Sequence, residues 1–283
     1  MNSVNRRVAL VTGANGGIGR EICEALLSAG CYVIFSCRSR EKSMSVFNGL
    51  CGKFGDDRLE MLVMDLSSLS SVTEVAAALV SRGIAIDILI NNAGMLGWKP
   101  QVTAQGYEMH YAVNCLHPIF FTWLLKPLLH KGSRVVNTAS CTVYLGTVPN
   151  KFPLPPGRFA RIKRYSDSKY ALLLLSLKLA RIWESDGITV NVSDPGIVNT
   201  PIITMHKWFD PLTDVLFRPV IRQAPEGAAT TVFLALDPSV GEKTAGFYAN
   251  KQSRRLPSRV AGKRDADRLW SFFLTLLHYG NKQ

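Results

Sequence analysis

Short apolar runs recur along the chain, separated by segments in which apolar residues follow a helical spacing. Seven runs have the length and content of buried strands, at residues 8–11, 32–38, 59–64, 86–90, 134–140, 188–193 and 245–248. Helical patterns lie between them, among others at residues 20–28, 111–129, 165–175 and 228–236. Because strands and helices alternate, the pattern predicts an α/β fold: a doubly wound parallel sheet (Rossmann fold) with helices on both faces.

We expect one domain over residues 1–283, because no stretch has the character of a linker. Three parts fall outside the regular pattern. Residues 141–164 form a proline-rich, basic insert, and residues 201–222 form an irregular aromatic segment suited to a substrate lid. Residues 251–283 form a C-terminal extension, whose amphipathic part at 269–277 should dock on the body of the domain. Ser71 and Glu74 have the spacing of a capping box for the third helix.

The chain has a formal net charge of +12, and most of it falls in residues 151–169 and 251–268. These segments are either solvated loops or a site for an anionic partner. Neither interleaves aromatic residues with its basic ones, which argues against a nucleic-acid partner. The six cysteines show no C-x-x-C spacing, so we expect reduced thiols and no metal site.

No signal-peptide pattern follows Met1, and no apolar stretch reaches the roughly 18 residues of a membrane span. We therefore expect a soluble, cytoplasmic protein with no transmembrane segment. Weak peripheral contact with a membrane and a homo-oligomer both stay open.

A glycine-rich turn follows the first predicted strand and precedes a helix. Gly13, Gly16, Gly17 and Gly19 fall within seven residues of each other, together with Asn15 and Ile18. Glycines allow the backbone to approach a pyrophosphate, and the helix N-terminus offers N–H donors to it. This pattern predicts a dinucleotide-binding turn.

The second strand ends at Cys37 and Arg38, where folds that bind NAD usually place an acidic residue to accept from the adenosine ribose. An arginine cannot accept such a hydrogen bond, but it suits a 2′-phosphate. We therefore expect NADP(H) as the cofactor rather than NAD(H).

Further polar residues stand at strand ends, where open α/β sheets bind their ligands. Asp65-Leu66 follows the third strand, and Asn91-Asn92-Ala93-Gly94 ends the fourth. Ser140 ends the fifth strand, and Asp194-Pro195-Gly196 ends the sixth.

Tyr165 and Lys169 stand four residues apart at the start of an apolar helix, so they should share one face. A free tyrosine titrates near ~10, and a neighbouring positive charge lowers that pKa. The pair is therefore a candidate acid–base group, with Tyr165 in the first helical turn.

With these motifs in order, the chain resembles a short-chain dehydrogenase/reductase. The matching residues fall into a cofactor turn, an adenosine-side set, a catalytic tetrad and a nicotinamide loop. In that order they are Gly13, Gly17 and Gly19; Asp65, Asn92, Ala93 and Gly94; Asn114, Ser140, Tyr165 and Lys169; and Pro195, Gly196, Val198 and Thr200. Within the family, Ser36-Cys37-Arg38, residues 65–69, residues 225–228 and the long Ser140–Tyr165 spacing resemble the retinol dehydrogenase and WW-domain oxidoreductase branch.

The resemblance implies hydride transfer between NADP(H) and a carbonyl or alcohol. Tyr165 would be the general acid and base, and Lys169 would lower its pKa and hold the nicotinamide ribose. Ser140 would bind the substrate oxygen, and Asn114 would hold a water that connects Lys169 to solvent. The aromatic residues at 201–222 favour an apolar substrate: a retinoid, a steroid, a fatty aldehyde or an aromatic ketone. The alternative is a non-catalytic NADP(H)-binding interaction or redox-sensing protein on the same fold.

Overall fold

The computed structural model describes residues 6–149, 160–198, 222–261 and 263–280. Thr200, most of the 201–222 segment and residues 150–159 of the basic insert lie outside the described residues.

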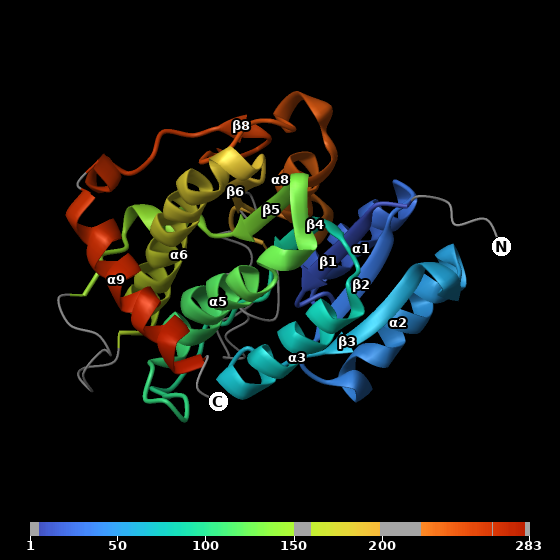
Figure 1. The fold of residues 1–283 in the computed structure, drawn as a ribbon, viewed down its shortest axis with the longest axis horizontal. Helices are drawn as coiled ribbons and strands as arrows, with labels where there is room; N and C mark the ends of the chain where they lie inside the picture. The colour runs from blue at the N-terminus through green and yellow to red at the C-terminus, as the bar shows by residue number, and fades with distance from the viewer. Residues whose placement is uncertain (1–5, 150–159, 199–221, 262, 281–283) are drawn as a thin grey trace, which may run out of the picture.

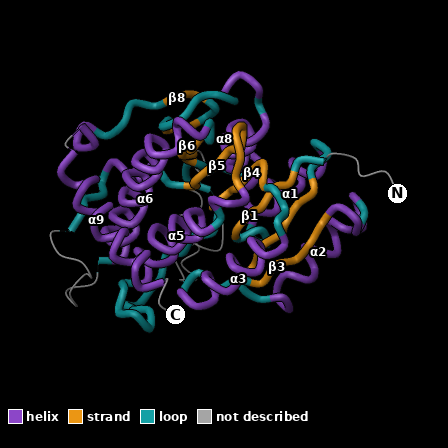
Figure 2. The backbone as a smooth tube through the Cα atoms, in the orientation of Figure 1, coloured by secondary structure: helices purple, strands orange, loops and turns teal. Residues whose placement is uncertain are grey.

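One eight-stranded sheet runs through the centre of the molecule in the order β3-β2-β1-β4-β5-β6-β7-β8 (Figures 1 and 2). All neighbouring pairs are parallel except β7–β8. The strands are β1 (Val8–Thr12), β2 (Tyr32–Cys37), β3 (Leu59–Val63), β4 (Ile86–Asn91), β5 (Leu129–Thr138), β6 (Thr189–Asp194), β7 (Phe247–Ala249) and β8 (Gln252–Ser253). The strand order reverses between β1 and β4, which places a ligand-binding crevice at the carboxyl ends of these strands. The predicted doubly wound Rossmann sheet is confirmed.

Helices cover both faces of the sheet. They are α1 (Gly17–Ser28), α2 (Arg40–Phe54), α3 (Leu69–Arg82), α4 (Met109–Tyr111), α5 (His117–Leu124), α6 (Arg161–Trp183), α8 (Ala224–Leu236) and α9 (Lys263–Gly280). Alternate residues of each strand face opposite layers. In β1, Leu10 packs into the core under α3, α5, α6 and α9, whereas Ala9 and Val11 pack into the core under α1, α2 and α8.

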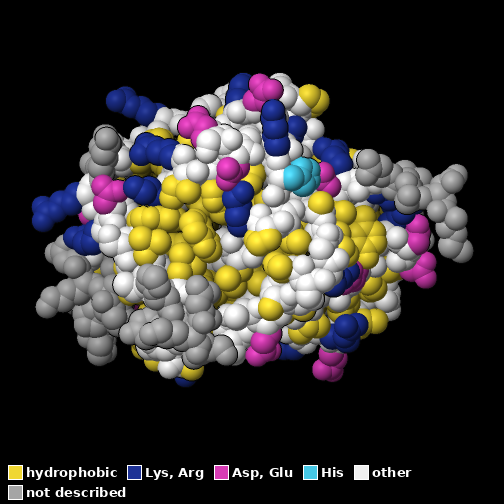
Figure 3. Space-filling view, in the orientation of Figure 1, with side chains coloured by type: hydrophobic (Ala, Val, Ile, Leu, Met, Phe, Trp, Pro, Cys, Tyr) yellow, Lys and Arg dark blue, Asp and Glu magenta, His cyan; other side chains and the backbone are white. Residues whose placement is uncertain are grey.

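The C-terminal helix α9 docks on the body beside α6 (Figure 1). Leu269, Phe273 and Leu276 of α9 are buried. The Trp123 ring of α5 lies 5.9 Å from Trp183 of α6 and 5.8 Å from Trp270 of α9, between ring centroids. Hydrophobic side chains gather over the region of α6 in Figure 3. None of the described helices has the length and hydropathy to cross a bilayer.

Several predicted boundaries are wrong. The helical pattern at 111–129 ends at Leu124, because Pro127 cannot continue a helix, and Leu129 already begins β5. The third helix has Ser68 as its N-cap instead of Ser71, and the Ser68 side chain accepts from the Ser71 N–H. Helix α6 begins at Arg161, so Tyr165 lies in its second turn rather than its first.

Candidate active site

The glycine turn packs its backbone against the end of β4. Gly13 has a φ of 64°, in the left-handed region, and an added Cβ would lie 2.8 Å from Cα of Ala93. At Gly19, an added Cβ would overlap the Gly13 carbonyl oxygen and lie 2.9 Å from Nδ2 of Asn92. Both positions therefore require glycine, and the turn lies against Asn92 and Ala93.

The first turn of α1 is suited to bind an anion. Its N-cap, Gly16, has no side chain to accept from the helix, and no acidic residue lies in the first turn. The first N–H groups of a helix have no partner within it, and they carry partial positive charge. A phosphate group fits this cradle.

The Asn92 side chain joins β4 to the glycine turn. Its Nδ2 donates to the carbonyl oxygens of Thr12 and Gly13 at 3.1 and 3.2 Å. In return, the Ala93 N–H donates to Oγ1 of Thr12 at 3.1 Å. These bonds hold the two strand ends at the crevice in a fixed relation.

Two predicted adenosine-side positions differ in their surroundings. Arg38 is exposed directly after β2, and the structure gives its side chain no partner among the described residues. Its guanidinium is therefore available to an anionic ligand. Asp65 is partly buried, and its Oδ1 accepts from the Ser67 N–H and hydroxyl, both at 2.8 Å. The next residue, Leu66, is held by its carbonyl oxygen, which lies 2.7 Å from Nδ1 of His117.

Ser140 and Tyr165 meet at the carboxyl end of β5. The Ser140 hydroxyl lies close enough to the Tyr165 phenol to lower its pKa, although 24 residues of sequence, including the basic insert, lie between the two. Ser140 Oγ also accepts from the Thr142 N–H at 3.3 Å, which fixes the rotamer of the serine. The phenol and the serine hydroxyl therefore converge on one point of the crevice.

Lys169 lies one turn further along α6 and is 3% exposed. Its Nζ donates to the Thr138 carbonyl oxygen at 2.7 Å and lies 5.9 Å from the Tyr165 ring centroid. An added Cβ at Gly94 would come within 3.3 Å of this Nζ and 3.4 Å of Oδ1 of Asn114. Gly94, just after β4, the Lys169 ammonium and the Asn114 amide thus lie close together.

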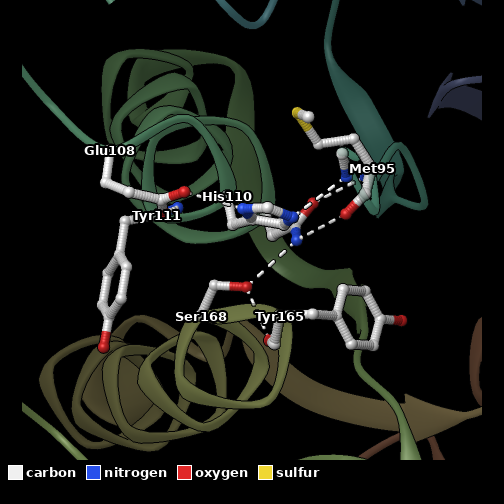
Figure 4. A network of polar contacts seen from close by, with 8 residues as sticks. Met95, Glu108, His110, Tyr111, Tyr165 and Ser168 are labelled. Carbon is white, nitrogen blue, oxygen red and sulfur yellow. Dashed lines mark hydrogen bonds and ion pairs between the residues drawn. The ribbon is translucent and has the colours of Figure 1, made fainter. Parts of the chain in front are cut away.

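Asn114 lies in a π-helical segment, Ala112–Leu116, between α4 and α5. Its Oδ1 accepts from the Met95 N–H at 2.7 Å, and its Nδ2 donates to the Met95 carbonyl oxygen at 3.0 Å. The same Nδ2 donates to Oγ of Ser168 at 3.0 Å, and that hydroxyl donates to the Tyr165 carbonyl oxygen at 2.7 Å. Figure 4 shows this network running from Met95 to the Tyr165 backbone. Asn114 therefore connects the loop after β4 to the helix that carries Tyr165.

The segment after β6 closes the crevice on the far side. Gly196 has a φ of 76°, and its N–H donates to Oδ1 of Asp194 at 2.8 Å. Val198 is buried, and an added Cβ at Gly227 would lie 2.6 Å from its Cγ2 and 3.4 Å from Cγ1 of Ile18. The predicted nicotinamide segment and the glycine turn thus meet over Gly227.

Residues 7–208 match the model of the short chain dehydrogenase family. The protein belongs to this family. The dehydrogenase is 33% identical over 284 residues to polyprenol dehydrogenase of Mus musculus, an alignment that covers 97% of this chain and 84% of the mouse protein. It is 30% identical over 273 residues to retinol dehydrogenase 12 of Homo sapiens, with 96% and 86% of the two chains covered. A solved blue fluorescent protein from a metagenomic library, in complex with NADPH, is 26% identical with a TM-score of 0.69, over 86% of this chain and 95% of that one.

Burial has the largest effect on the pKa values of both Tyr165 and Lys169. Burial raises the pKa of Tyr165 to about 12, and the hydrogen bond with Ser140 opposes the rise. Burial also lowers the pKa of Lys169 to about 8. In the protein without cofactor, the Lys169 ammonium donates to the Thr138 carbonyl oxygen. The expectation that Lys169, helped by the positive nicotinamide of the oxidised cofactor, lowers the Tyr165 pKa stays a prediction.

Sequence reasoning missed the residues that hold the candidate tetrad in place. Glu108 lies 2.7 Å from Nδ1 of His110, and Nε2 of His110 accepts from the Gly97 N–H at 3.0 Å (Figure 4). With Asn114 on Met95, these bonds fix the loop after β4 at two points. Ser168 lies between Tyr165 and Lys169, and the sequence patterns predicted no role for it. A hydroxyl three residues after Tyr165 was the available signal, because it lies near the Tyr165 carbonyl in a helix.

Proposed function

We propose that this dehydrogenase interconverts an apolar alcohol and its carbonyl compound with NADP(H). The convergence of Ser140, Tyr165 and Lys169 at the carboxyl edge of the sheet is the observation that carries the proposal. NADP(H), when bound, supplies the hydride donor or acceptor, and the protein supplies position and proton transfer.

The residues of the crevice fit this cofactor. The uncapped start of α1 suits the pyrophosphate, with Gly13, Asn15, Gly16, Gly17, Ile18 and Gly19 forming the turn. Arg38 suits a 2′-phosphate, and the related blue fluorescent protein was solved with NADPH. Asp65, Leu66, Asn92, Ala93 and Gly94 would lie along the adenosine half, and Pro195, Gly196 and Val198 along the nicotinamide half.

In carbonyl reduction, Ser140 donates a hydrogen bond to the substrate oxygen and stabilises the negative charge that develops there. Tyr165 donates its phenolic proton to the same oxygen, and Lys169 supplies positive charge next to the resulting phenolate. Because the pKa of Tyr165 is raised to about 12, the phenol is protonated at neutral pH, the state that reduction requires. Oxidation of an alcohol uses the phenolate, so its rate should rise with pH through the alkaline range.

An isoprenoid alcohol or aldehyde is the substrate class we favour. Polyprenol and retinol, named in two relatives, are both isoprenoid alcohols. Exposed apolar side chains also follow three of the strands that end at the crevice: Trp98 after β4, Leu145 after β5 and Ile197 after β6. Their exposure supports an apolar substrate.

The test is the loss of reduced-nicotinamide absorbance with a panel of isoprenoid, steroid, aliphatic and aromatic carbonyls. Tyr165→Phe should lower turnover by about a thousandfold or more, because it removes the proton donor, and NADPH should still bind. Tyr144→Phe is the matched control, since this exposed tyrosine donates to the Arg255 carbonyl oxygen and has no part in the proposed proton transfer. Wild-type binding of NADPH without turnover of any carbonyl would favour the non-catalytic alternative. Full activity of Tyr165→Phe would end the catalytic assignment.

A further inference from the structure

The loop after β4 runs along one side of helix α6, from the turn that carries Lys169 back to the first residue of the helix. Gly94 lies beside Lys169, since an added Cβ there would come within 3.3 Å of the lysine Nζ. Further along the loop, the Leu96 carbonyl oxygen accepts from Nη2 of Arg161 at 3.3 Å. Because Arg161 and Lys169 stand about two helical turns apart, the loop passes the turn of α6 that carries Tyr165.

Trp98 follows in this loop, with its ring stacked on Arg161. The guanidinium carbon lies 3.5 Å from the Trp98 ring centroid, which is a direct cation–π contact. Trp98 is nevertheless 51% exposed, whereas Arg161 is partly buried. The guanidinium therefore covers one face of the indole, and a large part of the ring stays open to a ligand.

The stacked pair lies close to the proposed proton donor. Arg161 and Tyr165 are four residues apart in α6, so their side chains share one face of the helix, about 6 Å apart along its axis. The indole on Arg161 therefore stands about one helical turn from Tyr165, on the side of α6 that carries the phenol.

Two further contacts hold the loop just before Trp98. Asn114 binds both backbone polar groups of Met95, and Nε2 of His110 accepts from the Gly97 N–H at 3.0 Å (Figure 4). An aromatic ring that is already held in place loses little conformational entropy when it contacts a ligand. The position of Trp98 is therefore fixed before a ligand binds.

We propose that Trp98 is a specificity-determining residue of this dehydrogenase: its open indole face contacts the apolar chain of the substrate, and Arg161 is the positioning residue that holds the ring. This inference rests on the proposed function and names the part of the substrate that the chain selects. A small carbonyl compound would react at Tyr165 without using Trp98. A long isoprenoid chain would extend over the indole and bury apolar surface on it.

The test compares kcat/KM for farnesal with kcat/KM for 3-methylbut-2-enal, which has the same reacting end without the long chain. In Trp98→Ala, the value for farnesal should fall by about 10- to 100-fold, mainly through KM, while the value for the short aldehyde should change less than about twofold. Trp98→Phe should recover part of the loss, because it restores an aromatic face. Ile182→Ala is the matched control, since this side chain is 38% exposed on the same helix but at the opposite end from Arg161.

Arg161→Met tests the positioning role, because it removes the guanidinium and keeps a long side chain. Alone, it should lower kcat/KM for farnesal by about 3- to 10-fold. Added to Trp98→Ala, it should have almost no effect, because it acts through the ring. Equal losses in both backgrounds would overturn the positioning role of Arg161.

This inference and the proposed function fail in different ways. No loss in Trp98→Ala, or equal losses for both aldehydes, would overturn the specificity role while the dehydrogenase activity stands. If the wild-type protein reduces no carbonyl, the proposed function fails, and titration of the NADP-loaded protein with fluorescent retinol decides the contact instead. Weaker retinol binding by Trp98→Ala than by the wild type then supports the contact, whereas equal affinity, or no binding by the wild type, overturns it.

Discussion

The two halves of the crevice are built by opposite means. On the β1–α1 side, the site consists of backbone made accessible by missing side chains: Gly13 and Gly19 leave room for the strand end, and Gly16 leaves the helix start uncapped. On the α6 side, the site consists of polar side chains: the buried Ser140, just after β5, the partly buried Tyr165 and the buried Lys169 of α6. Gly13 and Gly19 have no room for an added Cβ, whereas the second half depends on hydrogen bonds that hold its side chains in place.

This difference determines what the two halves should lose on substitution. A change in the glycine half should remove cofactor binding as a whole, because the backbone itself must move. A change in the polar half should leave binding intact and reduce turnover in proportion to the disorder it introduces.

The largest effect on cofactor binding is expected for Gly19→Ala, whose methyl group would overlap the Gly13 carbonyl oxygen. A rearrangement that costs about 3 kcal/mol would weaken NADPH binding by roughly a hundredfold, as measured by fluorescence titration. Gly49→Ala in α2 is the control, because an added Cβ there meets nothing within 4 Å. Tight NADPH binding by Gly19→Ala would contradict the cofactor assignment of the turn.

Asn114→Ala should separate binding from turnover. It removes the bonds to both Met95 backbone groups and to Ser168, so the loop after β4 loses the link to α6 that runs through Asn114. We expect kcat to fall by about 10- to 100-fold while the NADPH dissociation constant changes little. Ser168→Ala should show a smaller loss, since the Met95 bonds survive, and a larger loss in Ser168→Ala would refute this view of the network.

Arg38→Gln tests the cofactor half of the crevice through a side chain, whereas Gly19→Ala tests it through the backbone. Loss of a charge-assisted contact to a 2′-phosphate should reduce the preference for NADP over NAD by about 10- to 100-fold. The measurement is the ratio of kcat/KM for the two cofactors, with Arg40→Gln as the neighbouring control. An unchanged ratio would move the source of the preference away from Arg38.

The smallest effect is expected in stability: Lys169→Met should lose most turnover, because its charge supports the phenolate, yet change the free energy of unfolding only slightly. Burial lowers the pKa of Lys169 to about 8, so the folded protein binds this proton less tightly than the unfolded chain does. The cost is present in full below the folded pKa and is lost as the pH rises toward the unfolded value. After the lost bond to Thr138 is subtracted, we expect Lys169→Met to be more stable by about 1 to 2 kcal/mol at pH 7, and less so near pH 10.

Urea unfolding of the protein without cofactor checks this sign. Lys178→Met, on the same helix, removes only a surface pair with Asp267 and should change stability by less than about 1 kcal/mol at either pH. Destabilisation by Lys169→Met at pH 7 would show that its hydrogen bond outweighs the burial of its charge.

The contrast between the halves also explains what could be predicted from sequence. Glycine turns and strand ends are encoded in consecutive residues, so the Rossmann sheet and the glycine turn after its first strand could be predicted from the pattern alone. The helix expected to reach Leu129 ended early because apolar content does not distinguish the end of α5 from the start of β5. The partners of Asn114 come from long-range contacts that no local spacing encodes. The Tyr165 pKa depends on burial, which the four-residue spacing to Lys169 does not show.

The π-helical segment Ala112–Leu116 makes this helix sensitive to length. It holds one more residue than an α-helical turn would, so the faces of α4 and α5 are offset from each other by roughly the 100° of a single residue. Deleting one residue there would restore regular winding and rotate Asn114 away from Met95. A conservative exchange at position 114 would thus cost less than a neighbouring deletion, and variation along this helix should be confined to substitution.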